Sequence, residues 1–227
     1  MEVKNKIVNK IKSLKNKSDI IRYELYNLLK KSSGVNTHSK SPQLIVSLTT
    51  YPKRFNIVHL TIESLMNQTI KPDKIILWLA KEELSYGEIP KKILRLKSRG
   101  LDIRIVNENL RSYNKLIHAL EEFPTSTIIT CDDDIIYPKF FIEGLYKKSK
   151  EFPNHIIAYR CTWMKKISSN KLESYIKWES PKDNKPSFNL FPTGAGGILY
   201  PPNSLHDKVL DRKLFLKLAP TGDDIWV

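Results

Sequence analysis

The stretch STIITCDDDIIYP, residues 126–138, decides the expected fold. After Ser126, the next four residues are all β-branched, a pattern typical of a strand buried on both faces. Three aspartates, Asp132, Asp133 and Asp134, follow directly where that strand would end. In open α/β sheets, ligands bind outside the carboxyl ends of the strands. The stretch therefore predicts a parallel sheet with an acidic ligand site at its carboxyl edge.

Strand-like and helix-like segments alternate on both sides of this stretch. Strands are expected at 44–48, 74–79, 102–106 and 155–160, and helices at 55–68, 88–99, 113–122 and 211–218. Such alternation predicts an α/β fold with a mainly parallel central sheet and helices on both faces. The part between 161 and 190 mixes tryptophan, lysine and proline, and its elements cannot be placed from the sequence.

The chain divides into a basic N-terminal part, residues 1–42, and an α/β domain, residues 43–227. Within residues 3–31, apolar residues recur at spacings of three, four and seven, which traces one face of a helix between lysines. These residues are Ile7, Ile11, Leu14, Ile21, Leu25 and Leu28. Two interpretations stay open. The helix packs on the domain or on a partner subunit of a homo-oligomer, or it lies on anionic lipid as a peripheral membrane contact.

The formal net charge of +14 indicates attraction to polyanions without choosing among them. No helix-turn-helix, RNP-like or zinc pattern is present, so nucleic acid is not an expected partner. The chain opens with charged residues, and no run approaches the roughly 20 apolar residues of a membrane span. We therefore expect a cytoplasmic protein, with any membrane contact peripheral and at the inner face. Cys131 and Cys161 are expected to be free thiols.

The aspartate triplet indicates a metal site. Adjacent carboxylates repel one another, and their pKa values rise unless a cation neutralises them. Mg²⁺ or Mn²⁺ does so with oxygen ligands and commonly shares its shell with substrate phosphates. The alternative is that the triplet caps a helix beginning after Pro138. One aspartate would suffice for a cap, which favours the metal.

Five segments of the chain resemble, in order, those of family 2-like inverting glycosyltransferases with the GT-A fold. They are LIVSLTTYPKR (44–54), ESLMNQTIKPDKIILWL (63–79), TCDDDIIYP (130–138), GAGGILYPP (194–202) and GDDIW (222–226). The resemblance covers residues 43–227. It implies a GT-A fold and metal-dependent transfer of a sugar, with inversion, from a nucleotide donor, expected to be a UDP-sugar. The implied acceptor is a glycan or a lipid-linked molecule of surface polysaccharide synthesis.

Chemistry and the resemblance together assign roles to the acidic residues. Asp134 is expected to coordinate Mn²⁺ or Mg²⁺, while Asp132 and Asp133 contact ribose or complete the metal shell. Inverting transfer needs a carboxylate base to take the proton of the acceptor hydroxyl. Asp223 or Asp224 is the expected base, with Asp224 favoured.

The remaining expected site residues line the donor pocket. Thr49, Thr50 and Tyr51 would contact the nucleotide, and Arg54 and Lys115 would pair with its phosphates. Ordinary solvated charges are an equal alternative for those two cations. Gly194, Gly196 and Gly197 would let the backbone approach the donor sugar, or simply form a tight turn.

The sequence departs from the resemblance in two places. The strand expected at 74–79 lacks acidic residues that would recognise the base, and the chain ends at Val227, which suggests a truncated or short form.

Two other functions remain open. One alternative is a nucleotidyltransferase, although LTTYPKR lacks the glycine-rich loop of that class. The other is a non-enzymatic basic module that binds membrane or nucleic acid through residues 1–40.

Overall fold

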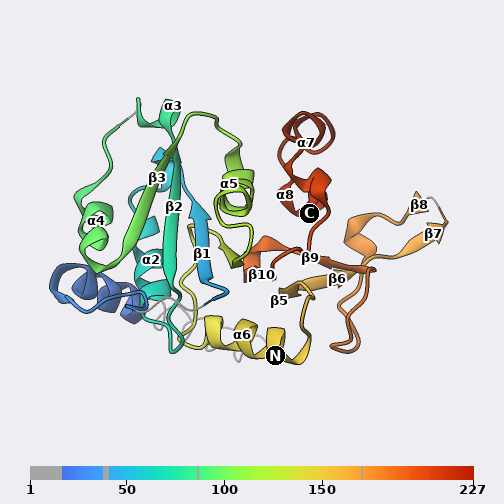
Figure 1. Ribbon diagram of the computed structural model, residues 1–227, viewed down its shortest axis with the longest axis horizontal. Coiled ribbons are helices and arrows are strands. Elements are labelled where there is room, and N and C mark those ends of the chain that lie inside the picture. Colours follow the sequence, from blue (N-terminus) through green and yellow to red (C-terminus); the bar gives the residue numbers. More distant parts are fainter. Residues whose placement is uncertain (1–16, 38–40, 86, 170) are drawn as a thin grey trace, which may run out of the picture.

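The computed structural model describes residues 17–37, 41–85, 87–169 and 171–227, and its centre is a six-stranded sheet (Figure 1). The strand order is β3-β2-β1-β4-β10-β5. Four strands pair in parallel: β1 (Leu44–Thr49), β2 (Lys74–Ala80), β3 (Leu101–Val106) and β4 (Thr127–Cys131). β10 (Ile198–Tyr200) runs antiparallel to both β4 and β5 (Ile157–Ala158). The predicted α/β fold with a mainly parallel sheet is confirmed.

Helices cover both faces of this sheet. On one face lie α2 (Val58–Met66), α4 (Lys91–Leu94) and α6 (Phe141–Glu151). On the other lies α5 (Asn114–Glu122), against which α7 (Arg212–Leu218) and α8 (Asp223–Trp226) pack through Phe215 and Trp226 (Figure 1). The short helix α3 (Lys81–Leu84) follows β2 directly. Where a helix was expected at 88–99, α4 is followed by the 3-10 helix Arg95–Arg99.

The central strands are buried on both faces, as their runs of apolar residues predicted. In β1, Val46 and Leu48 join the core under α2 and α6, whereas Ile45 joins the core under α5. Each of the three is fully buried. Burying one such side chain contributes about 1.5–3 kcal/mol, so the two-sided core holds the carboxyl ends of β1 and β4 in fixed register.

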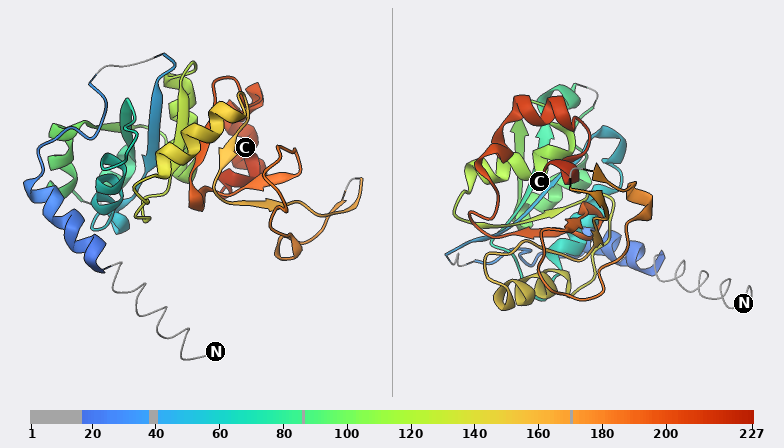
Figure 2. Two further views of the ribbon diagram at one scale, coloured as in Figure 1. Left: turned by 90° about the horizontal axis from the view of Figure 1, so that it is seen from below. Right: turned by 90° about the vertical axis from the view of Figure 1, so that its right-hand side faces the viewer.

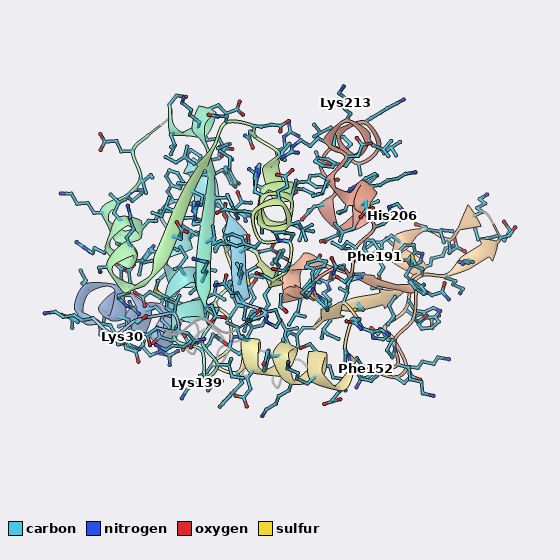
Figure 3. All side chains as sticks on the ribbon, in the orientation of Figure 1. Lys30, Lys139, Phe152, Phe191, His206 and Lys213 are labelled. Atoms are coloured by element: carbon cyan, nitrogen blue, oxygen red, sulfur yellow. The ribbon has the colours of Figure 1, made fainter. Side chains whose placement is uncertain are left out.

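Residues 159–192 form an excursion from the main sheet. β6 (Cys161–Trp163) pairs with β9 (Leu190–Pro192), and β7 (Lys166–Ser168) with β8 (Lys171–Leu172) (Figure 1). The rings of Tyr175, Trp178 and Phe191, the last labelled in Figure 3, lie edge-on to one another at its base. These strands have two or three residues each, too few for a periodic pattern in the sequence. The strand expected at 155–160 is likewise only β5.

The N-terminal helix, residues 17–29, packs on the α/β domain. Tyr23 and Asn27 are buried there, and the Asn27 amide donates to the carbonyl of Lys92 at 2.9 Å. One face of these residues therefore packs on the domain, as the first of the two interpretations expected. The rest of the expected helix, residues 3–16, lies outside the described chain. In the described residues, no helix has the length and apolar character needed to cross a membrane.

Candidate active site at the carboxyl edge of the sheet

A cavity of about 440 Å³ opens where β1 and β4 end. Several expected site residues line it, namely Thr49, Thr50, Tyr51, Arg54, Lys115, Asp132 and Asp133. The structure adds residues to which the sequence assigned no role in the site, namely Glu83, Asn109, Arg111, Ser112, Asn114, Cys131 and Thr221. Most of these belong to the polar segment NENLRSYN (107–114), which joins a strand to a helix. Its polar composition is the feature of the sequence that could have indicated these site residues. Both cysteines are free, as expected.

Asp133 fastens the loop after β1 to the loop after β4. Its side chain is buried, and its two oxygens accept hydrogen bonds from the Thr50 hydroxyl at 2.6 Å and from the Arg54 guanidinium. The Thr61 hydroxyl of α2 donates to its carbonyl at 3.0 Å. Both carboxylate oxygens therefore have protein partners, and Asp133 holds the wall of the cavity.

Arg54 lines the cavity and pairs with two aspartates of the triplet. Its second terminal nitrogen is 3.1 Å from a carboxylate oxygen of Asp134, which is exposed. Hydrogen bonding to Asp133, with the charges of both aspartates, raises the pKa of Arg54 above its ordinary value. The guanidinium also lies 5.6 Å from the ring centroid of Tyr51, which is 39% exposed. Thr49 donates its hydroxyl to the Trp78 carbonyl at 3.0 Å, so this side chain ties β1 to β2.

Lys115 is a buried cation held between two acidic segments that are far apart in the sequence. Its ammonium nitrogen lies 2.9 Å from Asp132 Oδ1 and 3.0 Å from Asp223 Oδ2. Burial lowers the pKa of Lys115, but attraction to Asp223 and Asp132 outweighs it, so the pKa ends above its usual value. The ammonium therefore stays charged at neutral pH and joins the end of β4 to the start of α8.

Asp224 faces the glycine-rich turn before β10. The Gly194 backbone N–H donates to its carboxylate oxygens at 3.0 and 3.1 Å. A Cβ at Gly194 would lie 3.1 Å from Asp224 Oδ1 and 3.2 Å from Lys115 Nζ, so a larger residue there would require these two charged groups to shift by a few tenths of an ångström. Burial raises the pKa of Asp224, and repulsion from Asp223 adds to the rise. α8 begins at Asp223, and its N-cap is Gly222 with no side-chain cap, so neither aspartate caps this helix.

The next two glycines serve the turn itself. Gly197 has φ +79°, and a Cβ there would lie 2.4 Å from the Phe141 ring. A Cβ at Gly196 would lie 3.2 Å from both Tyr159 Cβ and the Arg160 nitrogen. These contacts match the tight-turn alternative, and neither glycine is among the residues lining the cavity.

Protein cations neutralise the triplet in the structure. Arg54 pairs with Asp133 and Asp134, and Lys115 pairs with Asp132. The triplet does not cap the following helix, because α6 begins at Phe141 with no side-chain cap. Among the described residues, no three His, Cys, Asp or Glu side chains converge as a metal cage. Mg²⁺-type ions shared with substrate phosphates need only one or two carboxylates, and Asp132 and Asp134 retain solvent access for that.

Comparisons with known proteins give structural neighbours only. No family model and no curated protein sequence matches the chain. One similar structure is a mannosyltransferase from Pyrobaculum calidifontis in complex with GDP-Man and Mn²⁺, with 14% identity and a TM-score of 0.41. It matches 67% of this chain, which spans 46% of that protein.

Two further neighbours are named as enzymes of other classes. A 4-diphosphocytidyl-2C-methyl-D-erythritol synthase has 10% identity and a TM-score of 0.40, covering 77% of this chain and 86% of that one. A Bacillus anthracis protein described as a glucose-1-phosphate thymidylyltransferase has 13% identity and a TM-score of 0.41, covering 80% and 77%. Two of these three neighbours are thus named as transferases. Because the TM-scores lie below 0.5, the function proposed next rests on the site alone.

Proposed function

We propose that this chain is a metal-dependent glycosyltransferase that moves a sugar from a nucleotide donor, with a UDP-sugar as the first candidate, to a glycan or lipid-linked acceptor. The observation that carries the proposal is that Asp132 and Asp223 both pair with Lys115 beside the cavity, with Asp224 next to them on Gly194. An acidic strand end and a distant acidic pair meet at one edge of the sheet. A donor-binding half and a base-bearing half of an active site require that arrangement.

In this proposal the cavity receives the nucleotide. Tyr51 offers an exposed ring for the base or ribose, and Arg54 and Arg111 offer guanidinium groups for the diphosphate. Asp134 and Asp132 would hold Mn²⁺ or Mg²⁺ together with the phosphate oxygens. The bound ion would supply positive charge where the diphosphate leaves. Asp133, whose oxygens already have partners, positions the loop that carries Arg54.

Asp224 acts as the general base in this proposal. Its raised pKa makes it a better proton acceptor than an ordinary aspartate, and the Gly194 N–H fixes its orientation. The acceptor oxygen forms a bond to the anomeric carbon while the bond from that carbon to the diphosphate oxygen breaks. The hydroxyl proton passes to Asp224. A single displacement of this kind inverts the anomeric centre. Asp223, paired with Lys115, holds the neighbouring turn in place.

Calorimetry with UDP and Mn²⁺ tests the donor half. We expect saturable binding of UDP that requires Mn²⁺. The affinity should fall at least tenfold in Asp134→Asn and stay unchanged in Asp207→Asn, a substitution on the exposed surface. Absence of heat with the wild-type chain, or equal binding by the Asp134 variant, would overturn the donor site. If instead an NTP with a sugar phosphate releases pyrophosphate, the chain is a nucleotidyltransferase.

The base is tested separately. Asp224→Asn should bind UDP and Mn²⁺ like the wild type, because its side chain lies on Gly194 and not along the cavity wall. The same variant should lose donor turnover in a screen of nucleotide sugars and acceptors. Retained turnover would refute the role of Asp224 without touching donor binding.

A further inference from the structure

The N-terminal helix, residues 17–29, has one face docked on the domain. Tyr23 and Asn27 are 4% and 6% exposed. Next to them, the Glu24 carboxylate lies 2.7 Å from the Lys92 ammonium and 3.1 Å from the buried His59 ring. The helix is the blue element on the rim of the domain in Figure 2, and Figure 3 labels Lys30 just beyond its end. Polar contacts thus hold its inner side.

The outer face of this helix is apolar and uncovered. Ile21, Leu25, Leu28 and Leu29 are 62%, 49%, 60% and 73% exposed. At about 100° per residue, the mean direction of these four lies about 165° from that of the buried pair Tyr23 and Asn27. Helices of soluble proteins normally bury their apolar stripe against the core. Here the domain takes the polar side, and the apolar stripe points outward, which marks an interaction surface.

Charge identifies what covers this face. Residues 1–31 contain nine lysines and arginines and three acids. Of the acids in the helix, Asp19 pairs with Arg22 at 2.8 Å, and Glu24 is occupied by Lys92 and His59. Two copies stacked on this stripe would bring Lys17 of both chains together, and no acid of the helix is free to face it, because Asp19 is paired with Arg22 and Glu24 with Lys92. An anionic partner meets both the apolar stripe and the flanking cations.

We propose that residues 17–29 anchor the protein on an anionic lipid surface, with Ile21, Leu25, Leu28 and Leu29 entering the interfacial layer. Basic amphipathic helices bind in this way, by apolar burial together with attraction to anionic headgroups. The inner face stays on the domain, so the anchor carries the α/β domain rigidly. Glu24 contacts His59 in the first turn of α2, and Lys30 contacts Asn67, the residue that follows the end of α2. Because α2 follows the β1 loop, the anchor lies on the element next to the cavity.

Co-sedimentation of the full chain with vesicles tests this anchor. The vesicles contain phosphatidylcholine with or without phosphatidylglycerol, at low and high salt. We expect binding to the phosphatidylglycerol vesicles that weakens with salt and falls at least tenfold in Leu25→Ser/Leu28→Ser. Ile176→Ser, 86% exposed in the excursion, is the matched control and should bind like the wild type.

Three results would overturn the anchor: no binding by the wild type, equal binding by the double variant, or loss of binding in the Ile176 control alone. A wild-type dimer that the double variant converts to a monomer would assign the face to a second copy instead. Circular dichroism and Tm check that the double variant is folded. Binding of UDP and Mn²⁺, measured without vesicles, should be unchanged in it, so this proposal and the donor site fail or succeed separately.

Discussion

Lys115→Met removes the buried cation at the centre of the candidate site while keeping most of the side-chain volume. The ammonium now neutralises Asp132 and Asp223, and its own side chain is 9% exposed. In the variant the two carboxylates lose their partner and stand near Asp224, and within the described part of the chain no other lysine or arginine forms an ion pair with them. The folded state should therefore be destabilised by uncompensated negative charge.

The size of the loss follows from burial. Removing one member of a buried ion pair costs about 3–5 kcal/mol. Asp132 and Asp223 remain 28% and 17% exposed, so water screens them in part and the lower end applies, about 3 kcal/mol. For a domain of this size, 1 kcal/mol shifts Tm by roughly 2–4 °C, so Tm should fall by about 6–12 °C.

Differential scanning fluorimetry or calorimetry measures this shift, and Arg104→Met is the matched control. Arg104 pairs with Asp102 at 2.9 Å and Glu122 at 3.0 Å, but its side chain is 38% exposed, so its loss should cost about 0–1 kcal/mol. The pKa of Lys115 is higher in the folded chain than in the unfolded chain, so its contribution to stability is fully present at any pH below the pKa of the unfolded chain. The Tm difference between the wild type and Lys115→Met should therefore be the same at pH 7 and pH 9.

A double variant, Lys115→Met/Asp223→Asn, separates charge from packing. Removing a carboxylate along with the cation should restore part of the lost stability, because less unpaired charge remains. The bridging role of Lys115 is refuted if Lys115→Met is no more destabilising than Arg104→Met. It is also refuted if Asp223→Asn lowers the stability of Lys115→Met by as much as it lowers that of the wild type.

Two further predictions concern Asp224 and the glycine-rich turn. Asp224→Asn should raise Tm at pH 7, because the raised folded pKa of Asp224 means that folding disfavours its charge. This gain should shrink as the pH falls through that pKa, and thermal scans at pH 7 and pH 4 check it; a lower Tm at pH 7 would contradict it. Gly197→Ala should destabilise by more than about 1 kcal/mol, because φ is +79° and the new Cβ would meet Phe141 at 2.4 Å. Gly87→Ala, with nothing within 4 Å, is its control in the same Tm measurement, and equal Tm values would contradict the strain.

The strands and the acidic positions could be predicted from the sequence because local patterns encode them. Residues 44–48 and 126–130 are apolar on both sides of the pleat, and β1 and β4 form there within one residue at each end. The position of Asp132 at a strand end also followed from the sequence, since a buried run must stop where charges begin. The part between 161 and 190 could not be predicted, because its strands are short and exposed.

Tertiary structure alone decided how the charges are paired. The sequence predicted that a divalent metal ion would neutralise the triplet and assigned Arg54 and Lys115 to phosphates, but it could not show that these two side chains contact the aspartates themselves. The face that the N-terminal helix docks was equally hidden, because the apolar stripe that a helix usually buries points outward here. Periodicity along one chain reports which side chains share a face. Which face meets which partner depends on contacts between segments distant in sequence, and those exist only in the folded molecule.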